Sequence, residues 1–413
     1  MNAKVSIKIP LPSAIFDTPA LLLFEAQLPK HYQNHLDFCL IDYKCAHAFL
    51  YAYKDNTATY NAYRREIERF LLWAWIIQKK SILSLQRADL EIYLKFCQKP
   101  PKEWIGFNRV PHYLDKNGAR IPNSEWRPFV MSLSKAETKD GKIPDPKYYA
   151  LSDKAFREIF TVLSSFYNFL IQEAYAEINP VQQIRQKSKF LRKRQGSPKI
   201  RRLSDLQWGY VITAAKTLAE HDAKYERSLF IMTALYSMYL RISELTATPR
   251  WTPKMNDFQK DRDGHWWFTT VGKGNKERQI AVSDQMLDAL KKWRKHLGLS
   301  PTPSITDDTP LILKEKGNGP ISSAYQIRKI VQHCFDMAAS QMIQDGFAED
   351  AISLKEATVH WLRHTGISDD VKRRPREHVR DDAGHSSSLI TDKYIDVDLR
   401  ERYRSAKNKP IEQ

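Results

Sequence analysis

The chain has 413 residues, more than one average domain needs and enough for two. Hydrophobic residues make up 42% and aromatic residues 11%, which supports packed cores and excludes a disordered chain. Lys and Arg total 65 against 48 Asp and Glu, so the formal net charge of +17 favours a polyanionic partner such as nucleic acid. A membrane surface is the weaker alternative, because the sequence has neither an apolar run of about 18 residues nor the pattern of a signal peptide.

The cysteines and the nearby histidines indicate no special chemistry. There are four cysteines, Cys39, Cys45, Cys97 and Cys334. They are too sparse for a disulfide scaffold, and a reducing, cytoplasmic setting is the simplest interpretation. His31, His35 and Cys39 recur every fourth residue and precede Cys45 and His47, but the paired spacing of zinc modules is absent. We therefore expect an amphipathic helix here and predict neither metal ligands nor a cofactor.

The first half of the chain is predicted to be helical. Apolar residues follow the helical period over 63–74 and again over 156–170, and a further helix is expected over 87–96. Between them, residues 99–150 hold seven of the 21 prolines, and Asp115 to Gly118 has the pattern of a turn. We predict an extension of unknown role at 1–53 and a helical domain at 54–185 with an insertion at about 99–150.

A basic linker is predicted at 186–202, where lysines and arginines cluster around a glycine and a proline. Such a run is usually a solvated surface, or it can follow a DNA backbone. The remainder, 203–413, is predicted to be a second domain of mixed structure. Helices are expected over 203–218 and 228–239 and again from positions 284, 322, 358 and 376. Strands are expected over 266–271 and 278–282, joined by the turn that starts at Gly272.

Four short segments of the second domain carry residues suited to chemistry. They are Leu240-Arg241-Ile242-Ser243-Glu244-Leu245, the turn from Gly272 to Arg278 that contains Lys273, His360-Trp361-Leu362-Arg363, and Gly384-His385 followed by Tyr394. Each has an ordinary explanation by itself. Arg241 could pair with Glu244 one turn on, and Tyr394 could be a packing residue like most of the 19 tyrosines.

Together the four segments resemble the active site of the tyrosine recombinase (phage integrase) family, which shares its chemistry with type IB topoisomerases. The family signature is an arginine in a Leu-Arg-(Ile/Val)-Ser-Glu-Leu helix, a lysine in a β-turn, a His-x-x-Arg pair, a Gly-His and a tyrosine nine residues further on. Here Tyr394 stands nine residues after His385, and Arg363 stands three after His360. The resemblance covers roughly 203–398 well and 56–180 loosely.

The resemblance implies a fold and a set of catalytic residues. The fold is mostly α with a small β-sheet in the C-terminal domain (α+β), arranged as a two-domain DNA clamp in which a helical core-binding domain accompanies the catalytic domain. The implied catalytic residues are Arg241, Lys273, His360, Arg363, His385 and the nucleophile Tyr394.

The implied reaction is cleavage and rejoining of DNA through a 3′-phosphotyrosyl intermediate. Arg241 and Arg363 would clamp the non-bridging phosphate oxygens, because fork-shaped guanidinium groups stabilise the charge that grows there. Lys273 would protonate the departing 5′ oxygen, and His385 would donate a hydrogen bond to the phosphate. His360 is the better candidate for general base or acid, and the division of proton transfer between the two histidines stays open. No metal is required by this scheme.

Some residues depart from the family pattern. Met238 and Tyr239 stand where small residues usually precede the first arginine, and Ala383 replaces the leucine of Leu-Gly-His. Asp381 and Asp382 replace positions that are commonly apolar. These departures concern local helix packing more than chemistry.

The resemblance also implies partners and leaves alternatives open. It implies double-stranded DNA as substrate, a homotetramer on paired sites and a prokaryotic, nucleoid-associated setting when bound to DNA. One alternative is a type IB-like topoisomerase or telomere resolvase with the same residues, and another is a non-catalytic DNA-binding regulator. An intact set of six residues argues against the regulator. The resemblance is common to integration, excision, inversion and resolution, and the DNA target sequence is set by base-edge contacts that depend on groove geometry.

Overall fold

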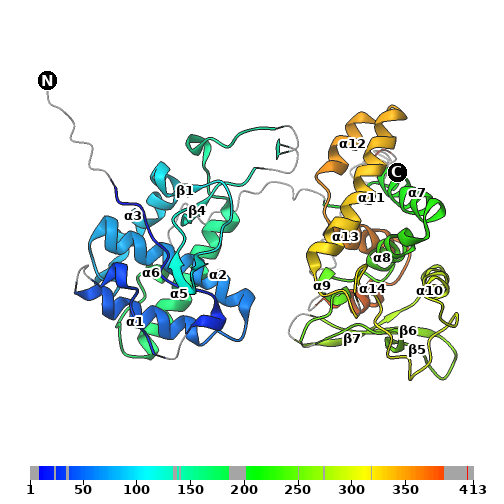
Figure 1. Cartoon of the computed structure of the whole chain (residues 1–413), viewed down its shortest axis with the longest axis horizontal. Coiled ribbons are helices and arrows are strands. Elements are labelled where there is room, and N and C mark those ends of the chain that lie inside the picture. Colours follow the sequence, from blue (N-terminus) through cyan, green and yellow to red (C-terminus); the bar gives the residue numbers. More distant parts are fainter. Residues whose placement is uncertain are drawn as a thin grey trace, which may run out of the picture. The chain divides into compact units, whose positions relative to one another are not determined.

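The computed structural model describes residues 9–22, 25–33, 37–133, 137–138, 141–185, 201–249, 251–272, 275–317, 319–385 and 407. The chain separates into two compact units, Met1–Gly196 and Ser197–Gln413. Figure 1 shows the first unit in blue to green and the second in green to red. The predicted linker at 186–202 lies outside the described residues except for Arg201 and Arg202.

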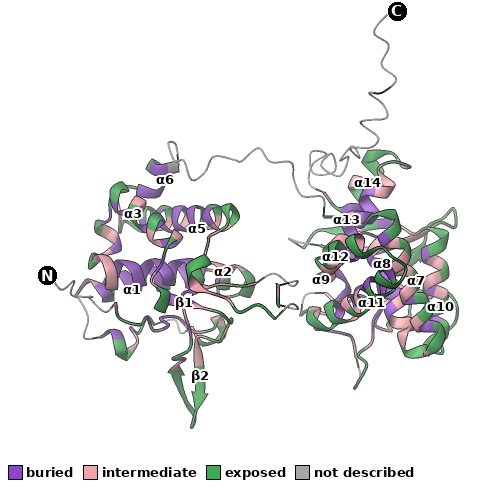
Figure 2. Ribbon diagram, turned by 90° about the horizontal axis from the view of Figure 1, so that it is seen from above, coloured by how far each residue is buried: buried purple, intermediate pink, exposed green. Residues whose placement is uncertain are grey.

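The first unit is a helical bundle with short strands at its side. Its elements are α1 (Phe38–Tyr51), α2 (Thr57–Leu72), α3 (Arg87–Gln98), β1 (Ile105–Gly106), β2 (Tyr113–Lys116), β3 (Ala119–Pro122), β4 (Phe129–Val130), α5 (Asp153–Gln172) and α6 (Pro180–Arg185). A π-helical turn, Trp73–Gln78, prolongs α2. The core lies between α1, α2 and α5, whose inner faces are buried in Figure 2. The rings of Phe49 and Phe166 join two of these helices, with centroids 5.1 Å apart.

Local capping explains where these helices begin. The Ser152 hydroxyl accepts a hydrogen bond from the backbone N–H of Ala155 at the start of α5. Asn179 does the same for α6, because its side-chain oxygen accepts from the N–H groups of Val181 and Gln182, and Pro180 fills the first helical position. Asn179-Pro180 therefore begins a helix.

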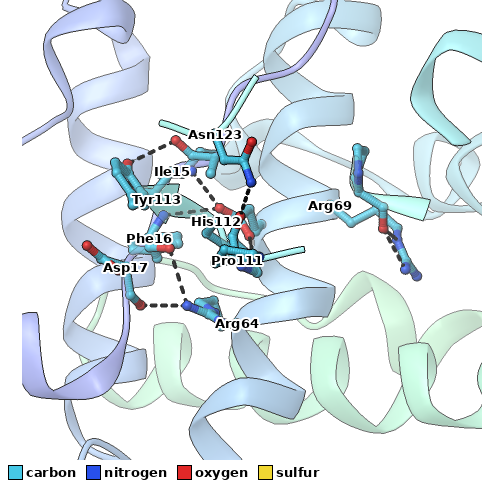
Figure 3. A network of polar contacts seen from close by, with 12 residues as sticks. Ile15, Phe16, Asp17, Arg64, Arg69, Pro111, His112, Tyr113 and Asn123 are labelled. Carbon is cyan, nitrogen blue, oxygen red and sulfur yellow. Dashed lines mark hydrogen bonds and ion pairs between the residues drawn. The ribbon is translucent and has the colours of Figure 1, made fainter. Parts of the chain in front are cut away.

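The N-terminal segment belongs to the core of this unit. Ile15 and Phe16 are buried, and their backbone N–H groups donate to Oε1 of the fully buried Glu68 on α2, at 2.5 and 3.1 Å. Arg64, also on α2, donates to the carbonyl oxygen of Asp17 at 2.7 Å, and Figure 3 shows the two residues facing each other. Residues 15–17 are thus fixed to α2 by polar contacts, and Ile15 and Phe16 are part of the same apolar core.

The insertion at about 99–150 is tied to the same helix. Nε2 of His112 lies 2.9 Å from Oε2 of Glu68. The hydroxyl of Tyr113 donates to the carbonyl oxygen of Ala14 at 3.0 Å. The predicted turn at Asp115 to Gly118 is confirmed as the tip of the β2–β3 hairpin, where Asn117 and Gly118 have positive φ. The hairpin itself is mostly exposed (Figure 2).

The helix expected around the histidines is correct only from Phe38 onward. His31 lies in a separate 3-10 turn, Lys30–Tyr32, and its Nε2 atom lies 3.2 Å from the carbonyl oxygen of Ala14. Cys39 and Cys45 are buried on α1. His31 and Cys39 are therefore not on one helical face, and His35 lies outside the described residues.

The second unit combines helices with one small sheet. Its elements are α7 (Asp205–His221), α8 (Glu226–Ser237), α9 (Ile242–Leu245), β5 (Phe258–Lys260), β6 (Trp266–Val271), β7 (Glu277–Ala281), α10 (Asp284–His296), α11 (Ala324–Gln344), α12 (Ala348–Lys355), α13 (Val359–Asp370) and α14 (Arg376–Ala383). The helices and the two strands expected in this half are confirmed, with β5 as an additional edge strand. The sheet is antiparallel in the order β5-β6-β7.

Helix α8 is the centre of this unit, with α7, α10, α11 and α13 packed around it. Its buried residues run from Ser228 to Leu235. Gly366 permits the close approach of α13, because a Cβ atom there would overlap the carbonyl oxygen of Tyr236. This packing brings the C-terminal end of α8 beside α13. Within the described residues, no helix has the length and apolar character needed to cross a membrane.

Candidate active site

Arg241 stands at a sharp corner between α8 and α9. Tyr239 has a positive φ of 50°, which is rare for a bulky residue, and it turns the chain back after α8. Arg241 then has an extended backbone (φ −76°, ψ 148°) and precedes the first turn of α9. The arginine expected inside a helix is therefore at the N-cap position, and its side chain stays 28% exposed.

The buried carboxylate of Glu244 holds two arginines. Its Oε1 lies 3.0 Å from Nη1 of Arg241, and the guanidinium of Arg278 donates to both oxygens at 2.7 and 2.9 Å. Burial alone would raise the pKa of Glu244, but hydrogen bonds and charge from Arg278 and Arg241 outweigh it and lower that pKa. Glu244 is thus ionised and fixes Arg241 beside strand β7.

The turn between β6 and β7 lies against this cluster. A Cβ atom on Gly272 would come within 3.1 Å of both Nη1 of Arg278 and Oε1 of Glu244, so only glycine fits without displacement. The N–H of Gly272 donates to the carbonyl oxygen of Lys276 at 2.8 Å. Lys273 lies outside the described residues, between this glycine and Asn275.

Arg363 is buried on α13 and bridges two other segments. Its Nη1 donates to the carbonyl oxygen of Tyr239, and its Nη2 donates to the carbonyl oxygen of Ala383 at 2.6 Å. The side chain is therefore held between the α8–α9 corner and the C-terminal end of α14. Such a fork leaves little rotational freedom in a guanidinium group.

Two histidines share the electrostatic field of these arginines. Partial burial, together with the positive charges of Arg363 and Arg241, lowers the pKa of His385 to about 4. The pKa of His360, an exposed residue in the first turn of α13, is also lowered by desolvation and then by the same two arginines. Arg241, His360, Arg363 and His385 are thus brought together in one cationic site with neutral imidazoles.

Gly384 allows α14 to end close to Arg278 and so places His385 in the site. It ends α14 at φ 63°, and a Cβ atom there would lie 2.8 Å from Cδ of Arg278. His385 follows directly, with its N–H bonded to the carbonyl oxygen of Arg380. Tyr394 lies outside the described residues.

The departures from the family pattern have a structural account. Tyr239 is buried and forms the corner described above, and Asp382 is buried while Asp381 is exposed and paired with Arg380. Sequence reasoning missed Arg278, whose position at the start of the returning strand, directly after the lysine turn, was the available signal.

The described residues contain one group of three possible metal ligands, Asp261, Asp263 and His265, at the β5–β6 turn. All three are exposed. Oδ1 of Asp261 accepts the backbone N–H groups of Asp263 and His265 at 3.0 and 2.8 Å. These contacts are those of an ordinary turn.

Comparison with known proteins agrees with this fold. The model of the phage integrase family matches residues 206–401. The chain is 26% identical over 322 residues to the tyrosine recombinase XerC of Thermodesulfovibrio yellowstonii, covering 77% of this chain and 90% of that protein. It is 24% identical over 263 residues to XerC of Caldanaerobacter subterraneus subsp. tengcongensis, covering 61% of each.

The fold is also that of a solved recombinase. The XerH site-specific recombinase in its post-cleavage complex with palindromic difH superposes with a TM-score of 0.53 at 16% identity, covering 90% of this chain and 87% of that chain. The class defined by fold and site is that of the tyrosine-type site-specific DNA recombinases. Residues 206–401 are a domain of the phage integrase family of these enzymes.

Proposed function

We propose that the chain cleaves and rejoins DNA strands at a specific site with Tyr394 as nucleophile and Arg241 and Arg363 as the phosphate clamp. The observation that carries this proposal is the convergence of the two arginines with His360 and His385 on one cationic site. A phosphodiester repels nucleophiles, and preorganised guanidinium groups stabilise the negative charge that grows on its oxygens. The fixed positions of both arginines supply that preorganisation.

The proposed step is a transesterification. The hydroxyl oxygen of Tyr394 bonds to phosphorus while the bond from phosphorus to the 5′ oxygen breaks. His360 takes the tyrosine proton, since its lowered pKa keeps the imidazole neutral near pH 7. Lys273 gives a proton to the departing 5′ oxygen. His385, neutral for the same reason, donates one N–H to the phosphate.

The products of this step are a 3′-phosphotyrosyl link and a free 5′-hydroxyl. The link conserves the energy of the phosphodiester bond, so attack by the 5′-hydroxyl of another strand restores the DNA without a nucleotide cofactor. Exchange between two sites then amounts to integration, excision or a related rearrangement.

Covalent trapping tests the proposal. The chain and its Tyr394→Phe variant are incubated in chelator with nicked duplexes from its own genetic neighbourhood and then separated on a denaturing gel. We expect a protein–DNA band with the wild type and none with the variant. Tight binding without any adduct, on duplexes that include the true exchange site, would instead support a DNA-binding regulator.

We also propose that four copies assemble on two paired sites, with each copy cutting one strand. The segment after Tyr394 is long enough for a short helix that docks on a neighbouring copy, and it lies outside the described residues apart from Lys407. Deleting Arg400 to Gln413 should spare binding of one copy to a half-site and weaken assembly in sedimentation velocity. Unchanged assembly would overturn this docking. A prokaryotic, nucleoid-associated setting stays a prediction.

A further inference from the structure

Arg363 and a second arginine connect the same two segments of the catalytic unit. Arg363 holds them through main-chain atoms, the carbonyl oxygens of Tyr239 and Ala383. Arg374, in the turn between α13 and α14, reaches both segments through side chains. Its Nη1 donates to the hydroxyl oxygen of Tyr239 at 3.0 Å, and its Nη2 lies 2.5 Å from Oδ2 of Asp382.

At Tyr239, the connection consists of three groups: the Tyr239 hydroxyl, the Asp370 carboxylate and the Arg374 guanidinium. The Tyr239 hydroxyl donates to Oδ2 of Asp370, at the last residue of α13, and Arg374 lies 3.3 Å from the same oxygen. The hydroxyl therefore donates to a carboxylate and accepts from a guanidinium at once. Hydrogen bonds to charged partners are stronger than neutral ones, so this arrangement fixes the ring of Tyr239. Tyr239 stands at the corner with positive φ, and its own carbonyl oxygen accepts the hydrogen bond from Arg363, so a shift of this residue would move one end of the Arg363 fork.

The Asp382 end reaches the sheet. Oδ1 of Asp382 accepts the backbone N–H of Ala281 on β7 at 3.3 Å, and its carbonyl oxygen accepts from Nε of Arg278 at 2.9 Å. The carboxylate side chain is only 7% exposed. The residue next to it, Ala383, supplies the other carbonyl oxygen that holds Arg363, and His385 follows two residues later. Arg374 thus restrains the immediate neighbours of both groups that position Arg363.

We infer that Arg374 is a positioning residue for the phosphate clamp, acting through Tyr239 and Asp382 on the guanidinium of Arg363. Both of these partners stand at the positions where the chain departs from the family pattern. The hydroxyl of Tyr239 and the buried carboxylate of Asp382 are thus both paired with the guanidinium group of Arg374. The inference rests on the proposed function, since it concerns the geometry of the clamp.

The test uses the full chain and the nicked duplex on which the wild-type adduct forms. Replacing Arg374 by Gln removes the charge and the fork, so single-turnover adduct formation should fall on the order of a hundredfold, as expected for a small displacement of a clamp. Duplex binding should change little. The matched control is Arg373→Gln, an exposed neighbour with the same loss of charge, which should stay within about twofold of the wild type.

Two further measurements separate positioning from general support of the fold. Tyr239→Phe removes one hydroxyl and keeps the ring, so it should slow cleavage about tenfold at a temperature well below its unfolding midpoint, where the variant is folded. In an Arg363→Lys background, which has already lost the fork to the two carbonyls, Arg374→Gln should slow cleavage by less than about threefold more.

The outcomes are distinguishable. Arg374→Gln and Tyr239→Phe both cleaving like Arg373→Gln would overturn the positioning role while leaving the proposed function intact. An equal loss from Arg374→Gln in both backgrounds would also overturn it. Failure of the wild type to form an adduct on its exchange site would instead overturn the proposed function.

Discussion

At the scale of single residues, backbone conformation and side-chain charge are set by neighbours far away in sequence. Gly384 ends α14 with φ 63° and touches Arg278, while Gly346 has φ 89° and has no atom within 4 Å of its Cβ position. Both glycines therefore have a positive φ that other residues adopt only with strain, and they differ in their surroundings. This contrast allows the effects of backbone strain and of side-chain contact on the free energy of unfolding to be measured separately.

Gly384→Ala should destabilise the second unit by roughly 2–3 kcal/mol, because a methyl group adds overpacking to left-handed strain and displaces Arg278 from Glu244. Gly346→Ala should cost about 1 kcal/mol from the backbone alone. Urea unfolding of both variants checks the difference. Equal losses would show that the contact with Arg278 contributes nothing.

The lowered pKa of His385 predicts how the stability of the protein depends on pH. The pKa of His385 is lowered to about 4, with burial as the largest cause, from an ordinary value of 6.5. A folded-state pKa below the unfolded value means that the unfolded chain takes up the proton first. Stability is therefore full above pH 6.5 and declines as the pH falls from 6.5 towards 4.

Proton NMR of the imidazole Cε1–H groups measures this shift directly, with His385→Asn to assign the resonance. We expect a midpoint for His385 near 4 in the free protein. A midpoint near 6.5 would contradict the desolvated, cationic surroundings described for this residue.

At the scale of secondary-structure elements, one carboxylate joins α9 to β7. Glu244 is 1% exposed and pairs with both Arg241 and Arg278, whereas Glu315 is 67% exposed and pairs with Arg227. Removing one partner from a buried ion cluster leaves uncompensated charge, while a surface pair is screened by water.

Glu244→Gln should therefore lower the free energy of unfolding by about 3 kcal/mol and slow cleavage, since Arg241 loses its support. Glu315→Gln should cost less than about 1 kcal/mol and leave cleavage unchanged. Chemical denaturation and single-turnover cleavage together test this. Similar small effects in both variants would refute the role of Glu244 as an anchor.

At the scale of the whole molecule, two compact units imply two unfolding transitions, each sensitive to its own core. The N-terminal segment belongs to the first core, where Phe16 is 1% exposed, whereas Leu11 nearby is 59% exposed. The segment is thus a structural part of the unit that holds α1, α2 and α5.

Phe16→Ala should shift one transition only, that of the first unit, by about 3–5 kcal/mol through loss of buried area and the cavity left behind. Leu11→Ala should shift neither transition by more than about 0.5 kcal/mol. Calorimetry of the full chain shows which transition moves. A shift in both transitions would contradict the expectation that Phe16 stabilises the first unit alone.

The sequence by itself determined the family and the candidate residues, because phosphoryl transfer by a tyrosine needs particular side chains at local spacings such as His360 to Arg363. It also predicted α7, α8, α10, α11, α13, α14 and the β6–β7 hairpin, where periodicity and turn chemistry act over a few residues. Only the tertiary structure decided which groups hold the candidates in place. Glu244 meets Arg278 from 34 positions away, and Arg374 meets Tyr239 from 135 positions away. Such contacts depend on packing between distant elements, and the spacing of residues along the chain does not specify that packing.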